Sequence, residues 1–351
     1  MYNSLAQKRS FYLGYIKSPS FDAFFILGVF SLAMVAGFTA DYFPEVAQII
    51  IILNIWLIGY HHVISTYTRL CFDKYSYNQS KTLMFGGLAL VVLIVFMLSQ
   101  YIGIWVLLSI YLYAQWFHYS RQSWGIARAY ERNAGDNIIE DRGFITQVAF
   151  YSFPTWGILY RSWQAPDSFL GIQLRVIPVS YELVFIVGSI SILFLFLWII
   201  KMVRLWWNGQ LPVAYVAFML SHFAVFYFGY IGLENIDSGW LVINLWHSLQ
   251  YILFVWLFNN RTYNGKEARN GEKFISMISQ NSKAWFYFGF CLLVTFLIYG
   301  LVSIFIDISL DSGWMNLSAL AITVIVYQTI NFHHYFVDAF IWRAKWIKKR
   351  G

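Results

Sequence analysis

The stretch AQIIIILNIWLIGYHHVISTYT, residues 47–68, contains no Asp, Glu, Lys or Arg. A helix of about 20 apolar residues spans the roughly 30 Å hydrocarbon core of a bilayer, because each residue adds about 1.5 Å. Residues 47–68 therefore predict a membrane-spanning helix. The two adjacent histidines near its end are polar groups placed in the membrane, where such groups usually serve a function.

Apolar segments of this length recur from residue 21 to residue 340, and of the 351 residues 59% are hydrophobic and only 12% charged. Soluble domains carry about twice that charged share. The predicted fold is an all-α, polytopic transmembrane helix bundle of about ten spans, forming a single integral membrane domain over residues 1–351. The third and fourth spans leave room only for a tight turn around Gln100. The predicted spans are 21–40, 47–68, 82–99, 101–120, 144–162, 181–201, 212–232, 239–258, 284–306 and 316–341.

Lys and Arg residues gather in alternate loops of this topology. Cytoplasmic loops of membrane proteins hold the excess of Lys and Arg, and all of these residues except Arg161 and Arg175 fall on one side, together with both chain ends. This predicts cytoplasmic termini and a position in the bacterial inner membrane. The topology explains the net charge of +7, and we expect no nucleic-acid partner. The long connectors 121–143 and 259–283 are expected to extend the preceding helices.

All seven histidines lie in or at the end of predicted spans. A polar side chain in hydrocarbon costs on the order of a few kcal/mol, so it is expected to face the bundle interior. Neighbours three or four residues away share its helix face. Four spans present a histidine in such a polar stripe: Asn54, His61 and Ser65, with His62 and Thr66 on the next line; Tyr111, Gln115, His118 and Gln122; Asn244, His247, Gln250 and Tyr251; and Gln328, Asn331, His334 and Asp338.

Metal sites inside helix bundles are built from side chains on facing helices, and polar neighbours orient each imidazole. We therefore predict a metal site near the cytoplasmic leaflet. Imidazole with a carboxylate suits iron, zinc or copper, and iron is the leading candidate. The pattern leaves open whether His61 or His62 is the ligand. The candidate ligands are His61, His62, His118, His247, His334 and Asp338, and the residues predicted to orient them are Gln115, Gln122, Asn244, Gln250, Gln328 and Asn331.

Other polar residues have simpler interpretations. His222 and His333 have mostly apolar neighbours on their helix faces, which favours packing. Asp22 fits a helix cap as well as a site role. Arg69 and Arg121 are candidates to bind a lipid headgroup or a substrate carboxylate, with anchoring at the membrane interface as the alternative. The two cysteines form no CxxC pair, so no disulfide framework or zinc knuckle is indicated.

A metal buried near the cytoplasmic leaflet can act on a lipid or isoprenoid that enters sideways from the bilayer. In this respect the chain resembles polytopic membrane di-iron desaturases and hydroxylases, whose histidines lie at the cytoplasmic ends of spans in HxxxH and HxxHH boxes. More loosely, it is similar to bacterial carotene-cleaving membrane dioxygenases. The pairs His61-His62 and His333-His334 lack the preceding spaced histidine of those boxes. The motifs of those families therefore assign no metal ligand in this chain. The resemblance implies a non-haem iron oxygenase, hydroxylase or desaturase, with a redox partner on the cytoplasmic side.

Three other classes remain open. Buried His and Asp residues also serve as proton relays and ion sites in transporters, although helix interruptions such as Pro154 and Pro212 are few. Haem binding uses paired axial histidines, but no span carries two histidines far enough apart for two stacked haems. In a structural membrane protein the polar stripes would only join helices.

Overall fold

The computed structural model describes residues 13–72, 74–135, 143–263, 272–311 and 318–342. Within these ranges the regular structure is helical apart from one short β-hairpin, so the predicted all-α class is confirmed. Apart from Lys17, the basic residues at the two chain ends lie outside the described residues. The cytoplasmic position of the termini therefore stays a prediction.

Within the described residues, each predicted span overlaps a helical stretch of the structure. Several stretches contain a π-helical segment, labelled η1 to η4. Two short helices, α12 (Lys273–Ile278) and the 3₁₀ helix η5 (Asn281–Lys283), precede α13. The spans correspond to α1 (Pro19–Ala23), η1 (Phe24–Gly28) and α2 (Val29–Tyr42); α3 (Pro44–Leu53), η2 (Asn54–Gly59) and α4 (Tyr60–Cys71); α5 (Lys74–Lys81), η3 (Thr82–Gly86) and α6 (Gly87–Tyr101); α7 (Ile104–Ala134); α8 (Phe144–Gln164); α9 (Tyr181–Trp207); α10 (Val213–Tyr227) and η4 (Phe228–Gly232); α11 (Ile236–Thr262); α13 (Ala284–Asp311); and α14 (Ala319–Ile341).

By length and composition, seven helical stretches of the described chain can cross a membrane: Pro19–Tyr42, Pro44–Cys71, Tyr77–Tyr101, Tyr181–Trp207, Val213–Gly232, Ile236–Thr262 and Asn281–Leu310. The helices α7, α8 and α14 are not among the seven. Two of them carry the polar stripes around His118 and His334, and α8 carries Arg161, which lowers their mean hydropathy. The structure indicates an integral membrane protein, and the count of ten spans stays a prediction.

The turn between α6 and α7 lies at Ile102 and Gly103, next to the predicted turn at Gln100. Gly103 has a φ of +113°, a conformation that glycine adopts without the steric cost of a Cβ atom. The helix α7 then continues to Ala134. The connector 121–143 thus begins as an extension of the preceding helix, as expected.

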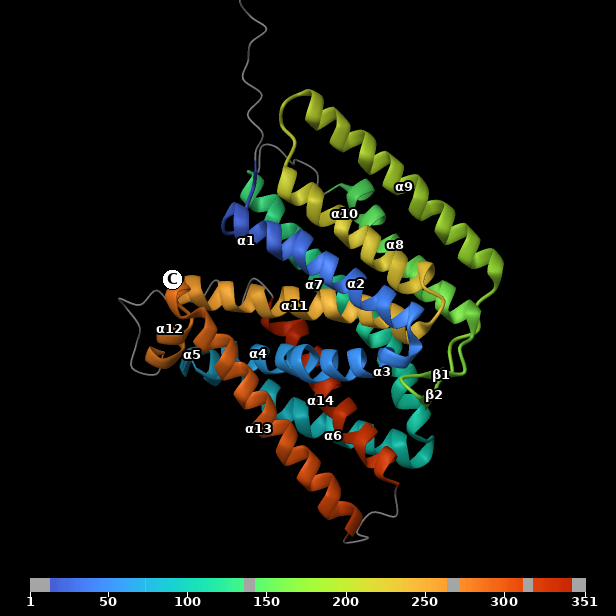
Figure 1. Cartoon of the computed structure of the whole chain (residues 1–351), viewed down its shortest axis with the longest axis vertical. Helices are drawn as coiled ribbons and strands as arrows, with labels where there is room; N and C mark the ends of the chain where they lie inside the picture. The colour runs from blue at the N-terminus through green and yellow to red at the C-terminus, as the bar shows by residue number, and fades with distance from the viewer. Residues whose placement is uncertain (1–12, 73, 136–142, 264–271, 312–317, 343–351) are drawn as a thin grey trace, which may run out of the picture. The chain divides into compact units, whose positions relative to one another are not determined.

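The chain divides into two compact units. Unit 1 comprises Met1–Gln48, Tyr119–Pro166 and Val176–His247. Within it, α8 packs along α9 and against α10 and η4, and α10 contacts α2 (Figure 1). The side chain of Arg161, 1% exposed, donates hydrogen bonds to the backbone carbonyls of Gly229, Leu233 and Glu234. These bonds join the end of α8 to the end of η4.

Unit 2 comprises Ile49–His118, Asp167–Arg175 and Ser248–Gly351. Its helix α14 packs against α4, α6 and α13, and α13 also packs against α4 (Figure 1). The boundaries between the units fall inside α3, α7 and α11 and at the two ends of the 167–175 segment, which links α8 to α9. The single membrane domain over residues 1–351 stays a prediction.

A β-hairpin in unit 2 is an element that the sequence did not predict. Its strands β1 (Ser168–Phe169) and β2 (Ile172–Gln173) pair antiparallel. Leu170 and Gly171 connect them with φ values of +51° and +75°, the positive values that a tight type I′ turn requires. The strands are too short for the period-two pattern that reveals longer strands in a sequence.

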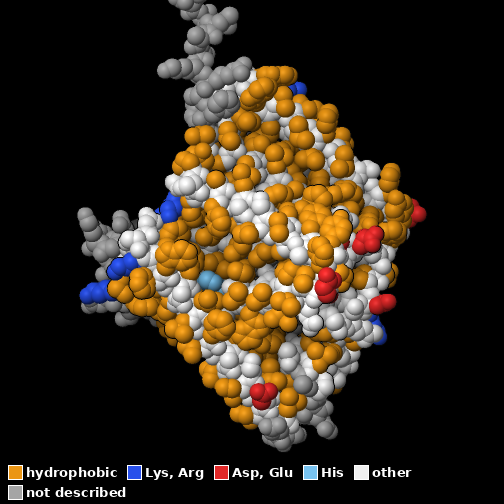
Figure 2. All heavy atoms as spheres, viewed as in Figure 1, with side chains coloured by type: hydrophobic (Ala, Val, Ile, Leu, Met, Phe, Trp, Pro, Cys, Tyr) orange, Lys and Arg blue, Asp and Glu red, His pale blue; other side chains and the backbone are white. Residues whose placement is uncertain are grey.

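Hydrophobic side chains cover most of the face drawn in Figure 2, where charged side chains are few. On α9, Leu193 and Phe196 are more than half exposed, and on α13 so are Leu297 and Leu301. A helix that faces water carries polar residues on its outer side. The outer surfaces of α9 and α13 are instead suited to contact with lipid.

Candidate metal centre

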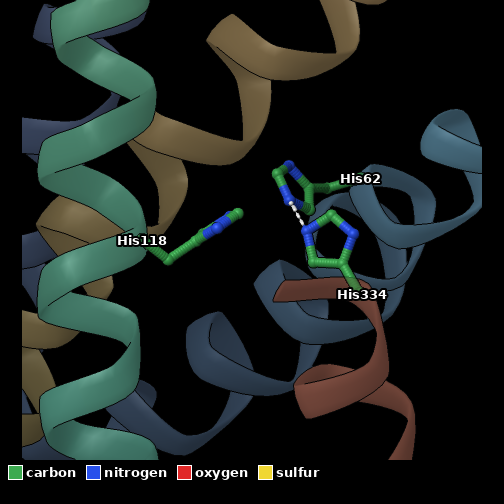
Figure 3. A group of neighbouring side chains, drawn as sticks. All are labelled: His62, His118 and His334. Atoms are coloured by element: carbon green, nitrogen blue, oxygen red, sulfur yellow. Dashed lines mark hydrogen bonds between the residues drawn. The ribbon is translucent and has the colours of Figure 1, made fainter. Parts of the chain in front are cut away.

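Three histidines from three helices of unit 2 converge on one point. His62 lies on α4, His118 on α7 and His334 on α14, and Figure 3 shows their rings turned toward one another. One nitrogen of each imidazole lies within 4.8 Å of the corresponding nitrogen of the other two. All three side chains are at least nine-tenths buried. These residues can hold a metal ion.

The closest approach within this cluster joins the Nε2 atoms of His62 and His334, which are 2.7 Å apart. The ring of His118 lies 5.1 Å from that of His334 and 6.1 Å from that of His62, centroid to centroid. Two nitrogens bound to one metal at about 2.0–2.1 Å can be no more than about 4.2 Å apart. The separations in the cluster, all within 4.8 Å, exceed this value only slightly, so small side-chain rotations would suffice to bring the three nitrogens around one ion.

A chain of hydrogen bonds extends from His334 away from the cluster. The Nδ1 atom of His334 lies 3.1 Å from the Thr66 hydroxyl, which is 2.8 Å from the hydroxyl of Tyr251. The Tyr251 hydroxyl donates to the Oδ1 atom of Asp338 at 2.5 Å. Asp338, predicted as a ligand, is not in the group of three, and its carboxylate is linked to the cluster through two hydroxyl groups.

Aromatic rings enclose the cluster. The Tyr251 ring lies 4.3 Å from that of His62, and the Tyr335 ring stacks on His118 at 4.4 Å with 28° between the planes. Such packing restricts imidazole rotation and excludes water. An apolar shell of this kind also controls access to a metal and its reactivity.

The histidines next to the two ligand candidates in sequence point elsewhere. The ring of His61 lies beside Phe288, and its buried Nε2 atom has no hydrogen-bond partner among the described residues. His333 bonds through Nδ1 to the hydroxyl of Tyr67 at 2.7 Å. In each His-His pair, one member belongs to the cluster, because consecutive residues on a helix are about 100° apart.

The predicted ligand His247 lies in unit 1, at the end of that unit's part of α11. Its ring packs 4.1 Å from that of Tyr119, whose hydroxyl donates to Asn244. Gln122 donates to the backbone carbonyl of His247 at 3.3 Å. Gln122, predicted to orient His118, thus bonds instead to the backbone of His247, and His247 is not in the group of three nitrogens.

The remaining predicted site residues have varied surroundings. Gln115 and Gln250 are fully buried, Gln328 is buried and Asn331 is half-buried. The guanidinium of Arg69 lies between the rings of Phe258 and Trp342, at 4.5 and 4.0 Å from their centroids. Arg121 is exposed. The predicted role of Arg69 and Arg121 in binding a lipid headgroup or a substrate stays a prediction.

Two residues outside the predicted site have structural partners. The His222 ring bonds to the Ser123 hydroxyl through Nδ1 at 2.9 Å and to the Phe150 carbonyl through Nε2 at 3.1 Å. This agrees with the packing role that its sequence neighbours favour. The carboxylate of Asp22 accepts three backbone N–H groups, from Ile16, Lys17 and Ser18, and so holds the segment before α1.

Thr66 and Tyr251 are the contacts that link Asp338 to the cluster. Both belong to the polar stripes of the sequence, but neither was predicted to bind the metal or to orient a ligand. Helical periodicity shows which residues share a face of one helix, but hydrogen bonds between helices depend on packing. Their role becomes visible only when α4, α11 and α14 are placed together.

Comparison with known proteins gives no relative. No protein-family model, curated protein or solved structure matches the chain.

Proposed function

We propose that this chain is a multi-pass membrane oxidoreductase whose His62, His118 and His334 bind one metal ion, and that the metal is iron. The supporting observation is the convergence of three buried imidazoles from α4, α7 and α14 within 4.8 Å. A single buried histidine is commonly satisfied by a helix–helix hydrogen bond. Three that meet at one point are the donor set of a metal site.

The number of ligands favours catalysis over a structural role. Structural zinc sites are usually closed by four protein ligands, whereas catalytic sites keep a coordination position open. Three imidazoles leave such positions for dioxygen and substrate. Iron bound there would supply dioxygen activation, and the chain's own residues hold the three rings and exclude water.

The proposed substrate is a membrane lipid or a lipid-soluble isoprenoid. Support comes from the packing of α13, whose outer surface is suited to contact with lipid, against α4 and α14, which carry two of the three histidines. A hydroxylation or desaturation with dioxygen consumes a pair of electrons in addition to those taken from the substrate. The proposal therefore includes a redox partner, which we place on the cytoplasmic side.

The proposed topology has ten spans in one membrane domain over residues 1–351, with cytoplasmic termini in a bacterial inner membrane. Its support is the distribution of Lys and Arg among alternate loops and the presence of a helix at each predicted span. The helices α7, α8 and α14, which are not among the seven, can cross the membrane in this topology if their polar faces are buried within the protein. A periplasmic signal from a reporter fused to the C-terminus would overturn it.

The π-helical segment η2, Asn54–Gly59, ends one residue before the His61-His62 pair. Single-turn π segments within α-helices are frequent at functional sites. This second feature also favours a functional role for the end of this span over simple helix packing.

The first experiment is metal analysis of the purified protein in detergent, together with its visible spectrum. We expect about one iron per chain and no haem Soret band, and we expect His118→Ala or His334→Ala to lose the metal. His222→Ala is the control, because His222 has its own partners in unit 1. If the unaltered protein binds no metal even after supplementation, a proton-coupled transporter or a structural role replaces the proposal.

A further inference from the structure

Helix α4 makes two similar hydrogen bonds to buried tyrosines. Thr66 lies 2.8 Å from the hydroxyl of Tyr251 on α11, and Thr68 lies 2.9 Å from the hydroxyl of Tyr287 on α13. Both tyrosines are at most 1% exposed. They differ in what lies beyond them: Tyr251 continues to Asp338 and, through Thr66, to His334, whereas Tyr287 and Thr68 bond to Asn259.

The donors and acceptors in the row of hydrogen bonds from Asp338 to His334 are determined at its Asp338 end. The Tyr251 hydroxyl has one hydrogen, which it donates to the Asp338 carboxylate. The hydrogen between Tyr251 and Thr66 must then come from Thr66. The Thr66 oxygen is left to accept a hydrogen bond, and its remaining neighbour in the chain is the Nδ1 atom of His334.

This direction determines the tautomer of His334. A neutral imidazole carries its proton on one nitrogen and a lone pair on the other. With the proton on Nδ1 and donated to Thr66, the lone pair is on Nε2. The Nε2 atom is the one that faces His62 in the cluster (Figure 3).

We propose that Asp338, acting through Tyr251 and Thr66, holds His334 in the Nδ1-protonated tautomer and thereby presents its Nε2 lone pair to the metal. Asp338, Tyr251 and Thr66 are positioning residues in this assignment. Metal-bound histidines usually donate their second N–H to a carboxylate, a carbonyl or water. Here two hydroxyl groups carry that interaction to a carboxylate on the same helix as the ligand, one turn further along α14.

Tyr251 also acts on a second ligand. Its ring lies 4.3 Å from the ring of His62, while its hydroxyl belongs to the chain that ends at His334. One side chain from α11 therefore restrains two of the three imidazoles. This inference rests on the proposed metal site, but the tautomer of His334 can be measured without any metal.

The first test is solid-state NMR of metal-free protein in lipid with ¹⁵N-labelled histidine, using His334→Gln to assign the His334 signals. We expect His334 to be neutral and protonated at Nδ1. In Tyr251→Phe we expect a mixture of tautomers, and in the matched control Tyr287→Phe we expect the spectrum of the unaltered protein. Protonation of His334 mainly at Nε2 in the unaltered protein would overturn the assignment.

The second test is a titration of the same three proteins with Co²⁺, followed by its visible absorption bands. Loss of an outer hydrogen-bond partner typically weakens metal binding by about 10–100-fold, and we expect this for Tyr251→Phe alone. Equal weakening in Tyr251→Phe and Tyr287→Phe would mean general loosening of α4 and would reject a positioning role. If the unaltered protein binds no Co²⁺, the metal site itself fails, and the NMR result still decides the tautomer.

Discussion

The Nε2 atoms of His62 and His334 lie 2.7 Å apart, although 272 positions separate the two residues in the chain. Without a metal, one hydrogen lies between these nitrogens, and the tautomer inferred for His334 assigns it to His62. When a metal binds, His62 must take its other neutral tautomer, with this hydrogen on Nδ1, so that both Nε2 lone pairs face the ion. The pair is therefore a hydrogen bond that a metal can replace without large movements of the helices.

Substitution of any one cluster histidine should remove the metal. In His62→Ala, His118→Ala or His334→Ala, two imidazoles remain, and we expect the metal content of folded protein to fall to a small fraction of its original value. His61→Ala should keep its metal, because the ring of His61 lies beside Phe288. Metal analysis normalised to monodisperse protein checks this, and loss of metal in His61→Ala alone would exchange the roles of the two neighbours.

Metal removal should lower thermal stability. A ligand present at 100 times its dissociation constant stabilises the folded state by about 2.7 kcal/mol, so a chelator is expected to reduce the melting temperature measured in detergent. His118→Ala should not respond to the chelator, since it has no bound metal to lose. An equal response in both proteins would show that the chelator acts on something other than this cluster.

The predicted ligand His247 can be tested in the same preparations. Because His62, His118 and His334 already form a three-nitrogen group, we expect His247→Ala to retain the metal. The packing of His247 on Tyr119 should make this variant less stable in a thermal unfolding assay. A loss of metal as large as that of His334→Ala would return His247 to the set of ligands.

Arg161 should be important for stability and not for the metal. Its guanidinium donates to three backbone carbonyls at the end of η4, and its removal leaves these acceptors buried without their partner. We expect Arg161→Ala to cost about 2–4 kcal/mol of unfolding free energy. The exposed Arg175, which lies over the Trp105 ring, is a matched control, and its substitution should cost about 0.5–1 kcal/mol. Similar stability of the two variants would contradict the structural role of Arg161.

The helical fold could be predicted from sequence because apolar length alone specifies a membrane-spanning helix. The predicted spans all fall on helices, and the turn near Gln100 is placed to within a few residues. Hydropathy is less informative where a helix carries a polar face, and α14, with His334 and Asp338, is the clearest example. The short β-hairpin at Ser168–Gln173 was missed, because its strands are too brief to show a pattern.

The candidate site could be predicted only in part, because a sequence shows the polar face of each helix but not how the helices pack together. The polar stripes identify His118 and His334 correctly as members of a histidine cluster, since each has polar neighbours on one helix face. They cannot choose between His61 and His62, because the choice depends on the rotation of α4 against α14. The link from Asp338 through Tyr251 also depends on packing between helices, which periodicity within one helix does not describe.

The π-helical segment Asn54–Gly59 has a consequence for how this span tolerates changes in length. A π segment accommodates one more residue per turn than an α-helix, so deletion of one residue from it can restore α-helical geometry while the flanking turns keep their orientation. The same deletion within Tyr60–Cys71 would rotate all later side chains by about 100°. Thr66 would then face away from His334. Deletion of one residue should therefore be accepted within Asn54–Gly59 and rejected between the histidine pair and Thr66.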